Sequence, residues 1–124
     1  MDEKKYGLKN WFFPDAELPP LGEGAMQGHE SIIILNPNKN LATVEIKCYF
    51  EYPKKSFIFT AEVEADSVRC LRTNEPEDMG GNEIPLETQY AISLHSDQPI
   101  VAQYGRLDNR QTNLAFYTTP GYAE

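Results

Sequence analysis

The chain has 124 residues and a formal net charge of −8 at pH 7. Its length fits one domain with one core, and its negative charge argues against a broad nucleic-acid surface or a surface for anionic membranes, because both depend on summed positive charge. No stretch approaches the ~20 apolar residues of a membrane-spanning helix, and no apolar segment of a signal peptide follows the charged residues 2–5. We therefore expect a cytoplasmic protein that forms a single domain over residues 1–124, with residues 1–8 and the last few residues loose.

Residues 9–13, which include Trp11, predict a short strand that ends at Pro14. Trp11 fits the core, with a sugar-stacking platform as the alternative. Prolines and glycines then predict an irregular loop as far as Gly28. The bulky apolar residues of this loop need cover from a lid or a subunit contact; they are Leu18, Leu21 and Met26.

Residues 32–35 are a β-branched apolar run, which predicts a strand. Residues 41–50 and 57–64 alternate apolar and polar residues, which is the pattern of half-buried strands, and a shorter strand is expected around Val68 and Cys70. Residues 73–85 are polar and rich in glycine and proline, and they predict a loop. For a cytosolic chain, Cys48 and Cys70 are expected to be reduced and buried rather than joined in a disulfide.

The last third of the chain predicts three more strands. The first covers residues 90–94 and ends at a turn over residues 96–99, the second begins at Pro99 and lies in the core, and the last covers residues 114–118. No window keeps an apolar stripe at helical spacing for three turns. The sequence therefore predicts an all-β fold, an antiparallel β-sandwich of about eight short strands.

A polar cluster is expected where the core strand ends. Arg106, Asp108 and Arg110 are spaced by two residues, so in an extended chain they share one face. They can form an ion-pair corner or a subunit interface, or they can bind a carboxylate, phosphate or sugar hydroxyl group. Gln103 is a polar residue in this apolar strand, and it is either a cross-strand clamp or a site residue.

Catalytic and metal sites have little support in the sequence. The chain has two histidines, His29 and His95, whereas a catalytic zinc site needs three protein ligands. Glu30 follows His29 in a predicted strand, so the two side chains point to opposite faces, and we expect no metal and no other cofactor. His29 fits a strand-end histidine bonded to the backbone, or a ligand contact. Glu30 or Asp108 could act as acid or base in a carbohydrate-active enzyme, but no second carboxyl group is placed opposite either one.

These residues resemble the sensory rhodopsin transducer family. The resemblance rests on residues 29–31 before an isoleucine-rich strand that ends at Asn36, on residues 99–101 with Gln103, and above all on residues 106–108 followed by Arg110 and Gln111. It extends from about Trp11 to the C-terminus.

The resemblance implies a cytoplasmic β-sandwich that assembles as a homotetramer and acts in signalling by binding, without catalysis. The implied partner is a membrane photoreceptor or another signalling protein, with a sugar or small metabolite as the alternative. The residues expected at the binding site or interface are His29, Glu30, Gln103, Arg106, Asp108 and Arg110.

Overall fold

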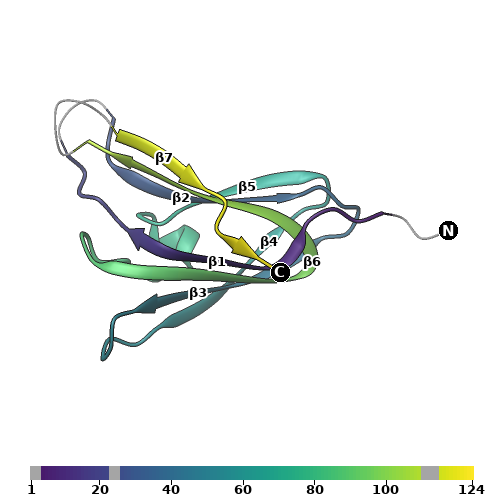
Figure 1. Cartoon of the computed structure of the whole chain (residues 1–124), viewed down its shortest axis with the longest axis horizontal. Helices are drawn as coiled ribbons and strands as arrows, with labels where there is room; N and C mark the ends of the chain where they lie inside the picture. The colour runs from purple at the N-terminus through teal and green to yellow at the C-terminus, as the bar shows by residue number, and fades with distance from the viewer. Residues whose placement is uncertain (1–3, 23–25, 110–114) are drawn as a thin grey trace.

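The computed structural model describes residues 4–22, 26–109 and 115–124. Within these ranges the regular structure consists of strands and one short 3-10 helix, η1 (Pro76–Met79). Figure 1 shows two layers of strands that diverge from a shared bend. The prediction of an all-β antiparallel sandwich is confirmed. No helix in the described part of the chain is long and apolar enough to cross a membrane.

One strand, β6 (Gln89–Asp108), belongs to both layers. In the first layer it lies between β3 (Ala42–Phe50) and β1 (Leu8–Glu17), and the strand order is β4-β3-β6-β1-β8. The outer strands of this layer are β4 (Phe57–Val63) and β8 (Tyr122–Ala123). In the second layer β6 pairs with β2 and β7, and β2 also pairs with β5. These strands are β2 (His29–Asn36), β5 (Ser67–Arg72) and β7 (Ala115–Thr119).

The turn predicted over residues 96–99 is wrong, because β6 continues through these residues (Figure 1). Its ladder with β3 reaches Ser96, and its ladder with β2 begins at Val101. Pro99 lies between the two ladders, where the missing proline N–H group is not needed for pairing. The chain therefore bends from one layer into the other without leaving the extended conformation.

Both ends of the chain are more regular than predicted. β1 continues past Pro14 to Glu17, and its pairing with β6 shifts register between Phe13 and Ala16. This irregularity accommodates the proline within a strand. At the other end, β8 pairs with Trp11 and Phe12, so the last residues are part of a sheet and are not loose.

The core fills the space between the two layers. Ile32 and Ile34 from one layer and Val44 and Ile46 from the other are fully buried, and the alternation in β3 predicts the burial of Val44 and Ile46. Burial of each such side chain contributes about 1.5–3 kcal/mol to stability. The core position predicted for Trp11 is confirmed, and its indole N–H donates to the carbonyl oxygen of Leu8.

The two cysteines differ in their environments. Both are free thiols, and Cys48 is buried as predicted. Cys70 is exposed, so the prediction of burial is wrong for this residue. The reason is its place on β5, which among the described strands pairs with β2 alone and turns Cys70 outward beside Ile33.

Candidate functional site

The side chain of Glu30 lies between the two layers and has no exposed surface. Each of its two carboxylate oxygens accepts two hydrogen bonds. Oε1 accepts from the hydroxyl groups of Thr73 (2.8 Å) and Tyr90 (2.6 Å). Oε2 accepts from the backbone N–H group of Glu17 (3.0 Å) and from the hydroxyl group of Tyr104. These four donors take the place of the water molecules that the carboxylate loses on burial.

The hydrogen-bond donors to Glu30 come from both layers. Glu17 and Tyr90 belong to the part of the sheet that contains β1 and β3, whereas Tyr104 lies in the β6 segment that pairs with β2. Thr73 follows β5, and its backbone N–H group donates to the carbonyl oxygen of Glu30 at 3.2 Å. The carboxylate therefore holds the two layers together through polar contacts. We call Glu30, Thr73, Tyr90 and Tyr104 the Glu30 cluster.

Arg106 extends this cluster toward the surface. Its Nε donates to the Tyr104 hydroxyl group at 3.1 Å, and its guanidinium group lies 4.9 Å from the ring centroid of Tyr117 and 4.0 Å from a carboxylate oxygen of Glu17. The Arg106 side chain retains 11% of its exposed surface. A guanidinium group keeps its charge at any physiological pH.

Burial near Glu30 raises the pKa of three neutral side chains. Burial, followed by the negative charge of Glu30, raises the pKa of the Tyr90 and Tyr104 hydroxyl groups well above the ordinary value for tyrosine. The same two causes raise the pKa of the Cys48 thiol from 9.0 to about 12. All three groups therefore stay protonated around neutral pH, and the two tyrosines remain donors to Glu30.

The structure brings together only part of the predicted polar set. Glu30 and Arg106 are directly opposite each other in the β2–β6 ladder. His29 faces away from Glu30, as strand alternation predicts, and its Nδ1 lies 2.9 Å from the carbonyl oxygen of Gln27. Gln103 is exposed and lies opposite Ile33 on the outer face. Asp108 is half-buried at the end of β6.

Arg110 is outside the described residues. The prediction that Arg106, Asp108 and Arg110 act as one unit therefore stays a prediction. The predictions from sequence did not include Thr73 and Tyr90. The sequence gives no clear signal for the burial of Glu30, because both faces of this strand carry apolar residues: Ile32 and Ile34 share the parity of Glu30, and Ile33 and Leu35 share that of His29.

Two hollows on the surface are neighbours, because Asn74 lines both of them. One, of about 380 Å³, is mainly apolar and is lined by Leu18, Leu21, Thr73, Asn74, Pro76, Glu83, Ile84 and Leu86. The other, of about 370 Å³, is lined by Met26, Gln27, His29, Arg72, Asn74 and Glu75. Leu18 is buried, whereas Leu21 and Met26 are about half exposed beside these hollows. Each volume is in the range of small-molecule sites.

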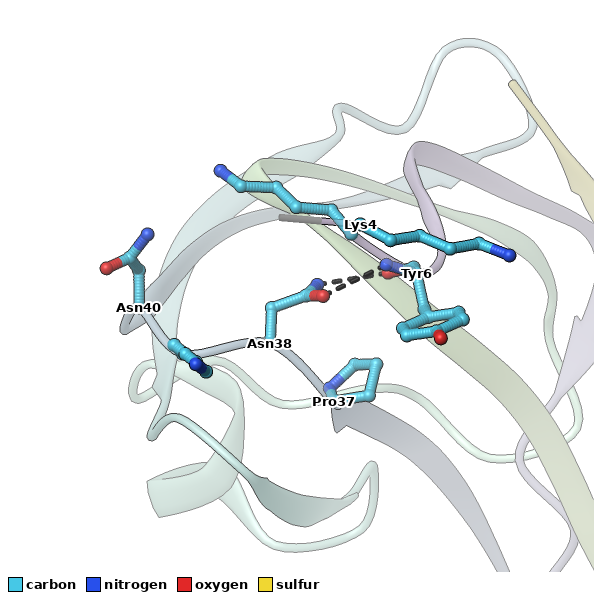
Figure 2. A pocket seen from close by; sticks show the side chains of 7 residues that line it. Lys4, Tyr6, Pro37, Asn38 and Asn40 are labelled. Atoms are coloured by element: carbon cyan, nitrogen blue, oxygen red, sulfur yellow. Dashed lines mark hydrogen bonds between the residues drawn. The ribbon is translucent and has the colours of Figure 1, made fainter. Parts of the chain in front are cut away.

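A third hollow, of about 320 Å³, is lined by Lys4, Lys5, Lys39 and residues of the loop after β2. Figure 2 shows Asn38 in this hollow, where its amide group bonds both backbone groups of Tyr6. Asn38 also donates to the carbonyl oxygen of Pro99 at 2.8 Å. These bonds attach the N-terminal segment to the bend of β6. Within the described residues, no group of three or more His, Cys, Asp or Glu side chains could hold a metal ion.

The fold and the site define a small antiparallel β-sandwich in which a buried carboxylate joins the two layers. The chain matches the family model described as Anabaena sensory rhodopsin transducer over residues 6–123, and it belongs to that family. The resemblance predicted from the sequence is thereby confirmed.

Two solved structures are similar to the chain. The structure titled "Crystal Structure of Thermotoga maritima 1070" has 31% identity and a TM-score of 0.85, and the match covers 95% of this chain and 96% of that one. The structure titled "Anabaena sensory rhodopsin transducer" has 29% identity and a TM-score of 0.68, and the match covers 82% of this chain and 91% of that one. No curated protein matched the chain.

Proposed function

We propose that this protein is a non-enzymatic adaptor that assembles as a homotetramer and binds a membrane photoreceptor or another signalling protein at the cytoplasmic side of the membrane. The observation that carries this proposal is membership of the transducer family over residues 6–123. The similarity to the solved Anabaena sensory rhodopsin transducer over 82% of the chain adds support.

The position of Glu30 favours binding over carbohydrate catalysis. A general acid or base has to reach the substrate, directly or through one water molecule. The carboxylate of Glu30 has no exposed surface, and four donors within the protein occupy its oxygens. This arrangement supports a structural role for the residue that was the first candidate acid or base.

The charge of the chain supports a membrane-protein partner. Cytoplasmic loops of membrane proteins carry an excess of Lys and Arg, and a chain with a net charge of −8 is attracted to such a surface. Binding to a sensory rhodopsin in nanodiscs, measured by interferometry, should be detectable at low salt and weaken as salt screens the charges. Nanodiscs without rhodopsin are the control. Equal signals from loaded and empty nanodiscs would contradict this partner.

The two hollows that share Asn74 favour a second candidate, the binding of a small metabolite or sugar. Ligand-observed NMR with monosaccharides and small organic acids tests it. The variant Leu86→Glu places a charge beside the apolar hollow at an exposed position and should abolish the NMR signal of a ligand bound there. The matched control is Ile58→Glu, an equally exposed aliphatic residue on β4. Loss of signal in both variants, or in neither, would count against this site.

A further inference from the structure

Positive charge gathers at one hollow of this strongly negative chain. The hollow of about 320 Å³ beside the N-terminal segment is lined by Lys4, Lys5 and Lys39, and no Asp or Glu is among its described lining residues. These are three of the 11 basic residues in a chain whose net charge is −8. Each of four other hollows in the described chain has at least one glutamate in its lining; these residues are Glu51, Glu62, Glu64, Glu75 and Glu83. We call the basic one the lysine hollow.

The two segments that carry these lysines are held together by buried amide groups. Asn38 is buried, and its side chain accepts from the N–H group of Tyr6 at 2.9 Å and donates to the Tyr6 carbonyl oxygen at 3.0 Å (Figure 2). Asn36 is fully buried and donates to the carbonyl oxygen of Asn40 at 2.8 Å, at the other end of the same loop. The spacing between the N-terminal segment and the loop after β2 is therefore set by the fold.

The N-terminal segment also lies directly against β6. Gly7 has a φ of +103°, and a Cβ atom there would overlap the backbone of Ile100. Only glycine allows this close approach, which sets the direction of the chain through Lys4 and Lys5. Nζ of Lys5 donates to the side-chain oxygen of Gln98 at 3.1 Å. Contacts with β6 thus fix where the two lysines leave the backbone.

The ammonium groups of Lys4 and Lys5 retain capacity for a ligand. Nζ of Lys4 lies 5.1 Å from the ring centroid of Tyr6, and Nζ of Lys5 bonds one amide oxygen. Both of these partners are neutral, whereas each ammonium group has three donors and a positive charge. Like charges on adjacent residues repel each other, and a bound anion offsets this repulsion.

We propose that the lysine hollow binds a small soluble anion with two or more phosphate groups. This site is independent of the adaptor role proposed above and separate from the two hollows that share Asn74. Lysine binds phosphate as a compact point charge, and three lysines from two segments suit a ligand with several charged oxygens. Arginine, whose planar fork matches a carboxylate in two parallel bonds, is absent from the described lining.

The size and charge of the surroundings favour a small ligand. A volume of about 320 Å³ is at the lower end of small-molecule sites, and the half-exposed Tyr6 ring and Pro37 give an apolar wall for the organic part of a phosphate ester. At physiological ionic strength the screening length is about 8 Å, so an anion in the hollow interacts mainly with the nearest lysines. An anionic membrane extends far beyond this length and also meets the carboxylates of the chain.

Two double variants test the site with equal changes of charge. Lys4→Gln with Lys5→Gln removes two adjacent lysines from the hollow. Lys54→Gln with Lys55→Gln is the matched control, because it removes two adjacent lysines from the turn after β3, where Lys54 also lies over a ring, 5.0 Å from the centroid of Phe50. The probe is inorganic pyrophosphate, titrated in a calorimeter at constant ionic strength. The first variant should bind pyrophosphate about tenfold more weakly than the parent, and the control should match the parent.

A single variant tests the loop side of the hollow. Lys39→Gln should weaken pyrophosphate binding about threefold, because the ligand contacts both segments. Its control is Lys9→Gln, which removes an exposed lysine from β1 outside the hollow and should leave the affinity unchanged.

The outcomes decide the site, the class of ligand and its source. Equal affinities for the parent and both double variants, or no binding to the parent, overturn the site. Citrate is the comparison anion, and citrate bound as tightly as pyrophosphate overturns phosphate as the class. If the parent sediments with phosphatidylglycerol vesicles but binds no pyrophosphate, the occupant is a membrane surface and the small soluble ligand is wrong. Binding to rhodopsin nanodiscs enters none of these measurements, so failure of the adaptor role is recognised separately.

Discussion

Glu30 and Arg106 are directly opposite each other in the β2–β6 ladder, and the hydroxyl group of Tyr104 links their side chains. The hydroxyl group donates to the carboxylate and accepts from Nε of Arg106. A buried negative charge and a nearly buried positive charge are thus connected through a neutral group, without direct contact between them.

Replacing Glu30 should destabilise the fold more than replacing an exposed glutamate. Glu30→Ala removes the acceptor for Thr73, Tyr90, Tyr104 and the Glu17 backbone and leaves Arg106 without a nearby buried countercharge. The expected loss is about 3–5 kcal/mol in urea denaturation followed by circular dichroism. The control Glu62→Ala, at an exposed position on β4, should cost less than about 0.5 kcal/mol. A Glu30→Ala loss below about 1 kcal/mol would show that the carboxylate does not hold the layers together.

The link through Tyr104 can be tested by removing one oxygen atom. Tyr104→Phe keeps the ring but removes the donor to Glu30 and the acceptor for Arg106, and it should cost about 1.5–3 kcal/mol because one partner is charged. Tyr117→Phe is the matched control, since it keeps the ring beside Arg106 and changes only the hydroxyl group of a partly exposed side chain. Equal unfolding free energies for the two variants would contradict the link.

Stability should decline at alkaline pH. Burial and the charge of Glu30 raise the pKa of Tyr90, Tyr104 and Cys48 in the folded chain, with the Cys48 value moving from 9.0 to about 12. As the pH rises above 9.0, the unfolded chain loses these protons first and the folded chain keeps them, so the free energy of unfolding decreases. The contribution of Cys48 to stability is therefore complete below this pH and is lost progressively up to about 12.

The cysteines allow a control for this pH dependence. Cys48→Ala removes one of the three groups and should make the decline shallower by at most about 1.4 kcal/mol per pH unit. Cys70→Ala changes an exposed thiol and should leave the slope unchanged. The measurement is a series of urea denaturation curves from mildly alkaline pH upward, and parallel slopes for all three proteins would refute the contribution of Cys48.

Gly121 should be essential for docking β8. Its φ is +71°, and a Cβ atom there would lie 2.6 Å from the backbone oxygen of Phe12 and from the ring of Phe13. Gly81 has a φ of +85° but meets no atom of the described chain within 4 Å. Both Gly→Ala changes incur backbone strain of about 1–2 kcal/mol, and Gly121→Ala should cost about 1–3 kcal/mol more from overpacking. Thermal melts of the two variants give the comparison, and equal melting temperatures would mean that β8 adjusts freely.

Alternation was sufficient to predict β3 and β4 and to place His29 and Glu30 on opposite faces of β2, because these features depend on neighbours along the chain. The partners of Glu30 could not be predicted in this way. Tyr90 is 60 residues and Tyr104 is 74 residues away, and each reaches the carboxylate only after β6 has paired in both layers. Sequence alternation indicates which face a side chain occupies, and it does not indicate which distant residue lies across the core.

The wrong prediction of a turn within β6 has a similar cause. Residues 96–99 contain serine, aspartate and proline, which favour turns in a local reading. In the folded chain these residues bond to distant segments instead. The Asp97 carboxylate accepts a hydrogen bond from the backbone of Thr43, and the carbonyl oxygen of Pro99 accepts one from the side chain of Asn38. The tertiary contacts of a bend between two sheets thus use the same residue types as a turn.

The continuity of β6 has a consequence for synthesis of the chain on the ribosome. β6 is the neighbour of β1, β2, β3 and β7, so neither layer can close before residues 89–108 have left the exit tunnel. Until then β1, β2 and β3 each present an open hydrogen-bonding edge beside apolar side chains, which is the state that chaperones bind and that aggregates form from. A nascent chain of which only residues 1–88 have left the tunnel should therefore be retained by a holdase chaperone, and one of which residues 89–108 have also left it should be released.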